Sequence, residues 1–141
     1  MAASVLVDAS FLVGLISRRD RNHRWAAQCP FRYPPPWNTC EAVLSETVHL
    51  VGAAGTPTIA TLLRRHAVVC SFRLNEHLDE VLQLMRKYAN VPMSLADACL
   101  VRMTETLPEP AVLTADTDFR IYRRHSRQTI PYVMPAGQGG R

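Results

Sequence analysis

The chain has 141 residues, 48% of them hydrophobic and 20% charged, with a formal net charge of +4 at pH 7. These values predict a single globular domain over residues 1–134 with a core of its own, followed by a flexible tail over residues 135–141. No basic region precedes the first apolar run and Asp8 interrupts it. This pattern argues against a signal peptide or a membrane span and for a cytoplasmic protein.

Residues 4–8 predict a buried strand that runs into Asp8 and then into a helix over residues 9–17. In open α/β sheets the functional site lies beyond the carboxyl ends of the strands, so Asp8 and Ser10 are placed for chemistry. Either side chain could instead simply cap the helix that follows.

A short helix should end before Pro30, and the prolines at 34–36 predict an extended connection to a short strand near residues 37–40. Thr39 is a candidate cap for a helix over residues 40–51.

Glu46 lies at the edge of the apolar stripe of this helix, which makes it a candidate for an inward-facing acid. The segment from Gly52 to Gly55 should end the helix, and Thr56 and Pro57 should start another.

Residues 68–72 predict a second main strand. A long amphipathic helix should start at Asn75 and bury one face, formed by Leu78, Val81, Leu82 and Met85.

Ser94 is a good N-cap for a helix over residues 95–101, in which Asp97 has apolar neighbours. Burial of a lone carboxylate is unfavourable unless it is paired, hydrogen-bonded or bound to a metal. Asp97 could instead simply interact with the helix dipole, which favours an acid in the first turn, and this alternative stays open.

A strand over residues 111–114 leads into Asp116 and Asp118, which could also belong to an ordinary turn. A basic helical turn is expected over residues 120–125 and an edge strand over residues 129–133. Strands and helices in this alternation predict an α/β domain with a mostly parallel central sheet that is covered on both faces.

The acids that follow strands or interrupt apolar stretches are candidates for one site. Carboxylates that converge in a pocket repel each other unless a hard cation neutralises them, and Mg²⁺ or Mn²⁺ is the natural choice. Such a pocket suits phosphoryl transfer. Almost all of the positive charge comes from arginine, a good phosphate ligand, which supports a phosphate-bearing substrate. The support is weak, because solvated arginines are common on protein surfaces. The arginines form three clusters: Arg18, Arg19, Arg21 and Arg24; Arg64 and Arg65; Arg120, Arg123, Arg124 and Arg127.

Four segments together closely resemble the motifs of PIN-domain ribonucleases, and most of all those of the VapC toxins of type II toxin–antitoxin systems. They occur in the family's order, and the resemblance covers residues 5–133. The segments are Asp8-Ala-Ser10, Thr39-Cys-Glu-Ala-Val-Leu-Ser-Glu46, Ser94-Leu-Ala-Asp97 and Leu113-Thr-Ala-Asp-Thr-Asp-Phe119.

The resemblance implies a PIN-like α/β/α sandwich that cleaves RNA with Mg²⁺ or Mn²⁺ and releases a 3′-hydroxyl. It implies Asp8, Glu46, Asp97 and Asp116 as the catalytic acids, with Ser10 as a polar neighbour. The metal ligands would be Asp8, Asp97, Asp116 and Asp118, and either Asp116 or Asp118 could be the fourth functional acid. Expected partners are RNA, an antitoxin protein and a second copy of the chain.

Two kinds of alternative stay open. The first is a PIN-domain nuclease of RNA processing without an antitoxin, or a PIN-like module that binds RNA or protein and no longer cuts. The second is another phosphate enzyme with an acid after its first strand. A haloacid-dehalogenase phosphatase needs an aspartate where Ser10 stands, and a receiver domain needs a late lysine, whereas Lys87, the sole lysine, lies in the predicted amphipathic helix.

Overall fold

A computed structural model describes residues 3–137 of the chain, so residues 138–141 of the predicted tail lie outside the described residues. Its centre is a five-stranded sheet in the order β3-β2-β1-β4-β7, in which every neighbouring pair is parallel. A two-stranded antiparallel hairpin, β5–β6, lies apart from this sheet. The strands are β1 (Ser4–Val7), β2 (Trp37–Thr39), β3 (Val68–Cys70), β4 (Pro110–Leu113), β5 (Arg123–Arg124), β6 (Gln128–Thr129) and β7 (Tyr132–Val133).

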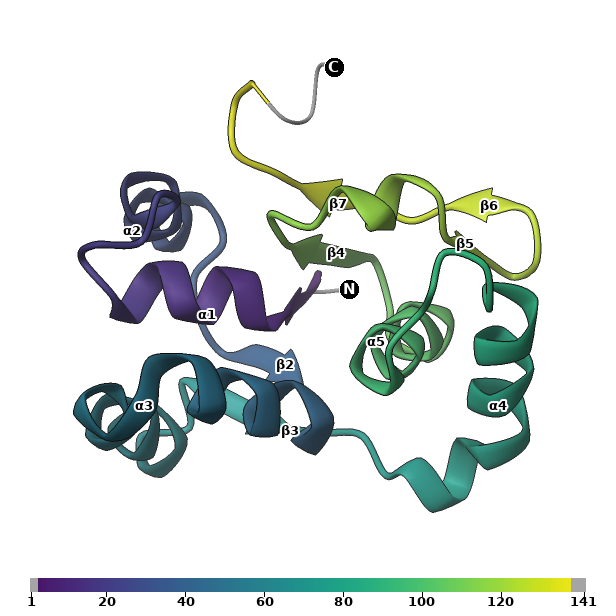
Figure 1. Cartoon of the computed structure of the whole chain (residues 1–141), viewed down its shortest axis with the longest axis horizontal. Helices are drawn as coiled ribbons and strands as arrows, with labels where there is room; N and C mark the ends of the chain where they lie inside the picture. The colour runs from purple at the N-terminus through teal and green to yellow at the C-terminus, as the bar shows by residue number, and fades with distance from the viewer. Residues whose placement is uncertain (1–2, 138–141) are drawn as a thin grey trace.

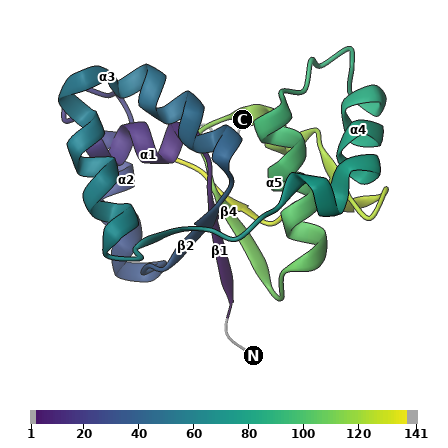
Figure 2. The same cartoon turned by 90° about the horizontal axis from the view of Figure 1, so that it is seen from below.

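Helices cover both faces of the sheet, with α1, α2 and α3 on one side and α4 and α5 on the other (Figures 1 and 2). The predicted α/β/α sandwich with a parallel sheet is therefore confirmed. None of the helices in residues 3–137 is long and apolar enough to cross a membrane. The helices are α1 (Ala9–Ile16), α2 (His23–Arg32), α3 (Glu41–Arg64), α4 (Leu78–Lys87) and α5 (Leu95–Thr106), with 3₁₀ turns η1 (Leu74–His77) and η2 (Thr117–Arg120).

Strand β1 lies in the middle of the sheet, between β2 and β4. Its residues Leu6 and Val7 are completely buried, because helices cover the sheet on both faces. A strand in this position needs a continuous apolar run, which the sequence supplies. The position also fixes the end of β1, and with it Asp8, beside the end of β4.

Helix α3 consists of two helical segments that meet at a kink at Gly52, where the sequence predicted the first to end, but the second starts directly after the kink and not at Thr56. Gly52 has φ 67° and ψ −168°, a backbone conformation that is essentially restricted to glycine, and the helix resumes directly after it. The Thr56 hydroxyl donates to the Gly52 carbonyl oxygen (2.9 Å). Pro57 lies five residues after the kink and removes one backbone donor from the second helical segment.

Helix α2 also exceeds its prediction, since it continues through Pro30 to Arg32. Pro30 removes one backbone donor, but the last turn still closes through a bond from the Tyr33 N–H to the Cys29 carbonyl oxygen (2.7 Å). The prediction for Thr39 was wrong as well. Cys40 is the N-cap residue of α3, and the Thr39 hydroxyl donates to the Val7 carbonyl oxygen (2.9 Å), which ties β2 to β1.

Helix α4 buries only part of the predicted face, in which Val81 and Met85 pack into or against the core. Val81 is fully buried, but Leu78 and Leu82 are 43% and 48% exposed. The expected helical turn over residues 120–125 is also wrong in its second half, where Arg123–Arg124 pair with Gln128–Thr129 across a turn. His125 and Ser126 adopt positive φ angles there, as a tight reversal requires.

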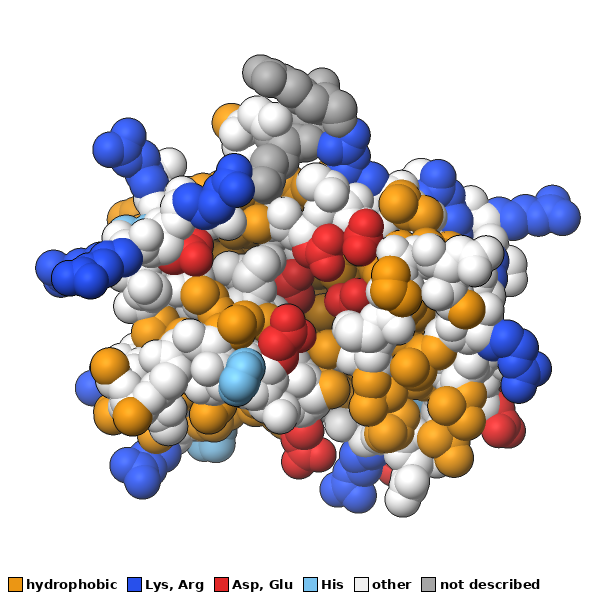
Figure 3. Space-filling model, in the orientation of Figure 1, with side chains coloured by type: hydrophobic (Ala, Val, Ile, Leu, Met, Phe, Trp, Pro, Cys, Tyr) orange, Lys and Arg blue, Asp and Glu red, His pale blue; other side chains and the backbone are white. Residues whose placement is uncertain are grey.

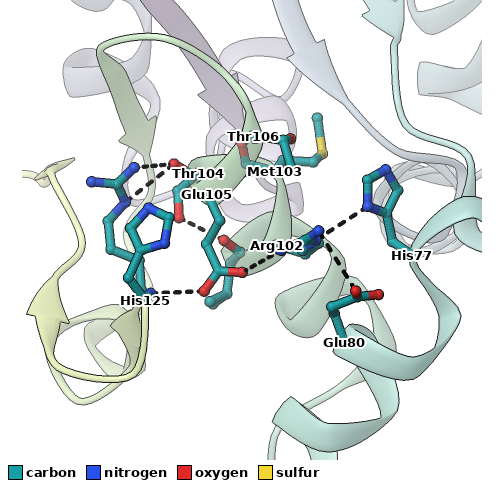
Figure 4. A network of polar contacts seen from close by, with 10 residues as sticks. His77, Glu80, Arg102, Met103, Thr104, Glu105, Thr106 and His125 are labelled. Carbon is teal, nitrogen blue, oxygen red and sulfur yellow. Dashed lines mark hydrogen bonds and ion pairs between the residues drawn. The ribbon is translucent and has the colours of Figure 1, made fainter.

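A polar network ties α5 to α4 and to the β5–β6 hairpin (Figure 4). Arg102 donates to His77 Nδ1 and to Glu105 (both 3.1 Å), and its guanidinium lies 3.8 Å from Glu80. Glu105 in turn accepts a bond from the His125 backbone N–H (2.8 Å). These contacts fix α5, the helix whose first turn carries Asp97.

Candidate active site

Asp8 is the first acid of the candidate site and is only 6% exposed. Its Oδ1 accepts hydrogen bonds from the Ser10 hydroxyl (2.6 Å) and the Phe11 backbone N–H (3.0 Å), and its Oδ2 accepts one from the Thr114 hydroxyl. The bond to Phe11 makes Asp8 the N-cap of α1. The capping reading is therefore confirmed, and the same carboxylate also lies where β1 ends.

Burial raises the pKa of Asp8 to about 6, and the negative charge of Asp116 adds to this effect. The hydrogen bonds from Ser10, Thr114 and Phe11 stabilise the carboxylate and act in the opposite direction. A buried carboxylate that is repelled by a second acid is stabilised by a nearby cation.

Asp116 and Asp118 follow β4 and are joined to Asp8 through hydroxyl groups. The Asp116 N–H donates to the Thr114 hydroxyl oxygen (2.9 Å), and the Ala115 N–H donates to the Ser10 hydroxyl oxygen (2.8 Å). The Asp118 N–H then donates to Asp116 Oδ1 (2.9 Å). The ends of β1 and β4 thus form one hydrogen-bonded unit.

Asp97 is half-buried and forms a capping box with Ser94 at the start of α5. Its Oδ2 accepts bonds from the Tyr122 hydroxyl (2.9 Å) and the Ser94 N–H (3.4 Å), so one carboxylate oxygen is held in place. Burial and the charge of Asp116 raise the pKa of Asp97, against the lowering effect of the Tyr122 and Ser94 bonds. Burial and the charge of Asp97 raise the pKa of Tyr122, which keeps its hydroxyl protonated as a donor.

Glu46 approaches the other acids from α3. Partial burial is the main cause that raises the pKa of Glu46, and the charges of Asp97 and Asp116 raise it further. The residue as a whole is exposed. Glu46 lines the same pocket as Asp97 and Asp116, as its position beside the apolar stripe suggested.

A small cavity of about 60 Å³ brings the acids together. Its polar lining consists of Asp8, Ser10, Glu46, Asp97 and Asp116. Figure 3 shows the acidic side chains gathered in the middle of this face of the molecule. We call it the acid pocket.

Asp118 does not line the acid pocket. Its backbone N–H is bonded to Asp116, a lining residue, and its pKa is raised by desolvation and by the charge of Asp116. Of the two candidates for the fourth acid, Asp116 is the one that faces the cavity.

The donor set fits a divalent cation of the magnesium type, because every charged ligand in the pocket is a carboxylate. As the side chains stand, no group of three or more Asp, Glu, His or Cys residues in the described part of the chain could hold a metal ion by itself. Mg²⁺ usually keeps several waters and takes only one or two protein carboxylates together with substrate phosphates, so a spread set of acids suits it.

Two residues of the site were missed from the sequence, Thr114 and Tyr122. Thr114 bridges Asp8 and Asp116 and is fully buried. One sequence signal could have identified Thr114. It lies two positions from an acid at the end of a strand, as Ser10 does from Asp8. No local signal marks Tyr122, which lies 25 positions from Asp97 in the sequence.

Thr114→Val is expected to weaken the site while keeping the shape of the side chain. The change removes a donor to Asp8 and leaves the Asp116 N–H without its acceptor, which should cost about 1–3 kcal/mol of unfolding free energy. Loss of such a supporting residue typically reduces activity by about 10–100-fold. Thermal unfolding and RNA cleavage assays check both effects.

Thr61→Val is the matched control for this change. Thr61 is an exposed residue of α3 whose hydroxyl donates only to a helix carbonyl oxygen, that of Pro57. Equal cleavage by the two variants would contradict a supporting role for Thr114.

Comparisons with known proteins agree with this geometry. The family model of the PIN domain matches residues 5–124. Among solved structures, the chain is similar to VapC20 of Mycobacterium tuberculosis, described as a sarcin-ricin loop cleaving toxin. The TM-score is 0.63 at 20% sequence identity, and the match covers 77% of this chain and 87% of that one. No curated protein matches the chain.

Proposed function

Since the chain belongs to the PIN domain family, we propose that it is a metal-dependent endoribonuclease that hydrolyses RNA phosphodiester bonds. The observation that carries this proposal is the convergence of Asp8, Glu46, Asp97 and Asp116 on one small cavity beyond the ends of β1 and β4. These acids come from four distant stretches of the chain. Roles in helix caps or turns alone would not require them to meet in one cavity.

Asp8, Asp97, Asp116 and Asp118 would hold Mg²⁺ or Mn²⁺, one or two of them directly and the others through the waters of the cation. When bound, such a cation polarises a phosphodiester and makes water a better nucleophile at neutral pH. Ser10 and Thr114 orient Asp8, and Tyr122 orients Asp97, so that the carboxylates keep their places as substrate enters.

Glu46 is suited to accept a proton from the attacking water. Its raised pKa makes it a stronger base than an ordinary glutamate, and it is the most accessible of the four acids. Attack of water on phosphorus breaks the bond to the 3′-oxygen, which leaves as a 3′-hydroxyl after taking up a proton.

We further propose that the chain is the toxin of a type II toxin–antitoxin pair, acts as a homodimer in the cytoplasm, and is inhibited by a small antitoxin protein. The overall likeness to VapC20 supports this assignment. The acid pocket would attract a cationic side chain at the end of an antitoxin tail. A small gene directly upstream whose product copurifies with this chain would distinguish a toxin from an RNA-processing nuclease.

Metal removal tests the nuclease proposal directly. Purified protein should cleave total cellular RNA in Mg²⁺ or Mn²⁺ and stop when a chelator is added. Asp97→Asn should lose cleavage but keep its circular dichroism spectrum, because Ser94 still caps α5. Sequencing of the cleaved ends maps the target.

Asp79→Asn supplies the control, since Asp79 is an exposed acid on α4 outside the pocket. Unchanged cleavage by the Asp97→Asn protein would remove the model of four cooperating acids.

A further inference from the structure

A second hollow, of about 710 Å³, lies next to the acid pocket and between α1 and α3. Helices α1 and α3 lie side by side (Figure 1), and the loop of residues 17–22 closes one end of the space between them. Its volume is in the range of pockets that hold drug-sized ligands, about 300–1,000 Å³. We call this hollow the α1–α3 groove. Residues that line it include Ser10, Val13, Ile16, Arg19, Val51 and Ala54.

The groove meets the acid pocket at Ser10, which lines both. The Ser10 hydroxyl donates to Asp8 and accepts a bond from the Ala115 N–H, so the junction is held rigidly. A chain-like ligand with its reacting group in the acid pocket therefore has a direct path into the groove.

The walls of the groove combine apolar and polar chemistry. Val13, Ile16 and Val51 are only partly buried, which leaves aliphatic surface for a flat ring to cover. At the far end, Arg19 is exposed and Asp20 and Asn22 add polar groups. The Asp20 carboxylate accepts a bond from the Asn22 N–H (2.9 Å), which orders this end of the loop.

Basic side chains also mark this side of the molecule. Four arginines lie within the loop and the start of α2, at positions 18, 19, 21 and 24. Figure 3 shows Lys and Arg side chains projecting from the side that α2 occupies in Figure 1. A ligand that spans the groove thus has a cation site at one end and arginines at the other, an arrangement that suits a polyanion.

We propose that the α1–α3 groove binds the nucleotides of single-stranded RNA that adjoin the scissile phosphate, an inference that rests on the proposed nuclease function. A base lies against the aliphatic wall of Val13 and Val51, and Arg19 binds a neighbouring phosphate. Single-stranded RNA fits because its bases are free to leave the stack and pack against side chains. The groove then determines which sequences reach the acid pocket.

Two substitutions test this inference. Ala54→Trp fills the groove and should weaken RNA binding about tenfold, the effect of losing one base contact. Arg19→Ala should weaken binding several-fold and reduce the slope of log Kd against log salt concentration by about 0.7, the value for one phosphate contact on a single strand. Binding is measured by fluorescence anisotropy of a labelled RNA oligonucleotide, with Asp97→Asn present in every protein so that the RNA stays intact.

The matched controls are Ala53→Trp, an exposed neighbour on α3 that does not line the groove, and Arg86→Ala on α4. Neither should change RNA binding more than about twofold. With Asp97 restored, Ala54→Trp should lose activity on RNA but keep that on bis(p-nitrophenyl) phosphate, a small diester that needs only the acid pocket.

The outcomes separate the two proposals. If Ala54→Trp and Arg19→Ala bind and cleave RNA as well as their controls do, the groove inference is wrong and the nuclease function stands; this is also the result expected of a peptide-binding groove. If the unaltered chain cleaves neither substrate but Ala54→Trp still weakens RNA binding, the nuclease function is wrong and RNA binding in the groove stands.

Discussion

Asp8→Asn is expected to reduce RNA cleavage by about 100-fold or more while the protein stays folded. Asparagine is also a good N-cap, so the bond from the Phe11 N–H that starts α1 can be kept. The variant lacks the negative charge that would attract a cation beside Asp116. Cleavage assays in Mg²⁺ and Mn²⁺ measure the loss.

The same substitution should change how stability depends on pH. The pKa of Asp8 rises from 3.8 to about 6 on folding, so between these values the folded protein binds more protons than the unfolded chain. Unfolding free energy therefore falls as pH rises through this window, by about 3 kcal/mol from Asp8 alone, and is flat with respect to this group above it.

Asp8→Asn removes this contribution. In metal-free buffer, the stability of the variant relative to the original chain should increase by about 2.4 kcal/mol between pH 4 and pH 7. Urea denaturation at several pH values measures it. A stability difference that is constant with pH would show that Asp8 is not a destabilising buried charge.

Phe11→Ala is expected to lower the unfolding free energy by about 3–5 kcal/mol. Phe11 is fully buried, and its ring makes edge-to-face contacts with Trp25 and Trp37, with centroids 5.8 and 5.2 Å away. It joins α1, α2 and β2 directly behind Asp8, so its loss should also loosen the acid pocket and reduce cleavage.

Phe31→Ala is the control for this substitution, because Phe31 is 90% exposed. It should change stability by less than about 0.5 kcal/mol. Chemical denaturation of the two variants checks the prediction, and similar unfolding midpoints for both would contradict the central packing role of Phe11.

The sequence was sufficient to predict the order of the main strands and helices, since the apolar run before Asp8 and the N-cap at Ser94 are strong local signals. The positions of the four acids in distant segments were also predictable, because acids at strand ends or beside apolar stripes stand out. For Asp8 and Asp116, convergence follows from the rule that parallel strands end at one edge of the sheet. Glu46 and Asp97 lie on helices, and only the resemblance to PIN-domain ribonucleases grouped them with the other two. The structure brings Asp8, Glu46, Asp97 and Asp116 to one cavity.

Features set by tertiary contacts could not be predicted in this way. Threonine is a common helix cap, but the Thr39 hydroxyl donates instead to the Val7 carbonyl oxygen of the neighbouring strand β1. Leu82 fits the helical pattern of a buried face, yet the packing of α4 on α5 leaves it half exposed. The bond between Tyr122 and Asp97 depends on how the chain returns after β4, which no local pattern encodes.

The place of β4 in the sheet has a consequence for protein synthesis. Strand β4 follows its partner β1 by about a hundred residues in the sequence, and its residues pair with β1 along its whole length. Asp116 comes just after it and 19 residues after Asp97, so a growing chain carries three of the pocket's four acids before the fourth is made. A nuclease built in this order cannot form its complete site while most of it is still emerging from the ribosome, an assembly made largely of RNA. Premature termination before residue 110 likewise yields a product without a complete acid pocket.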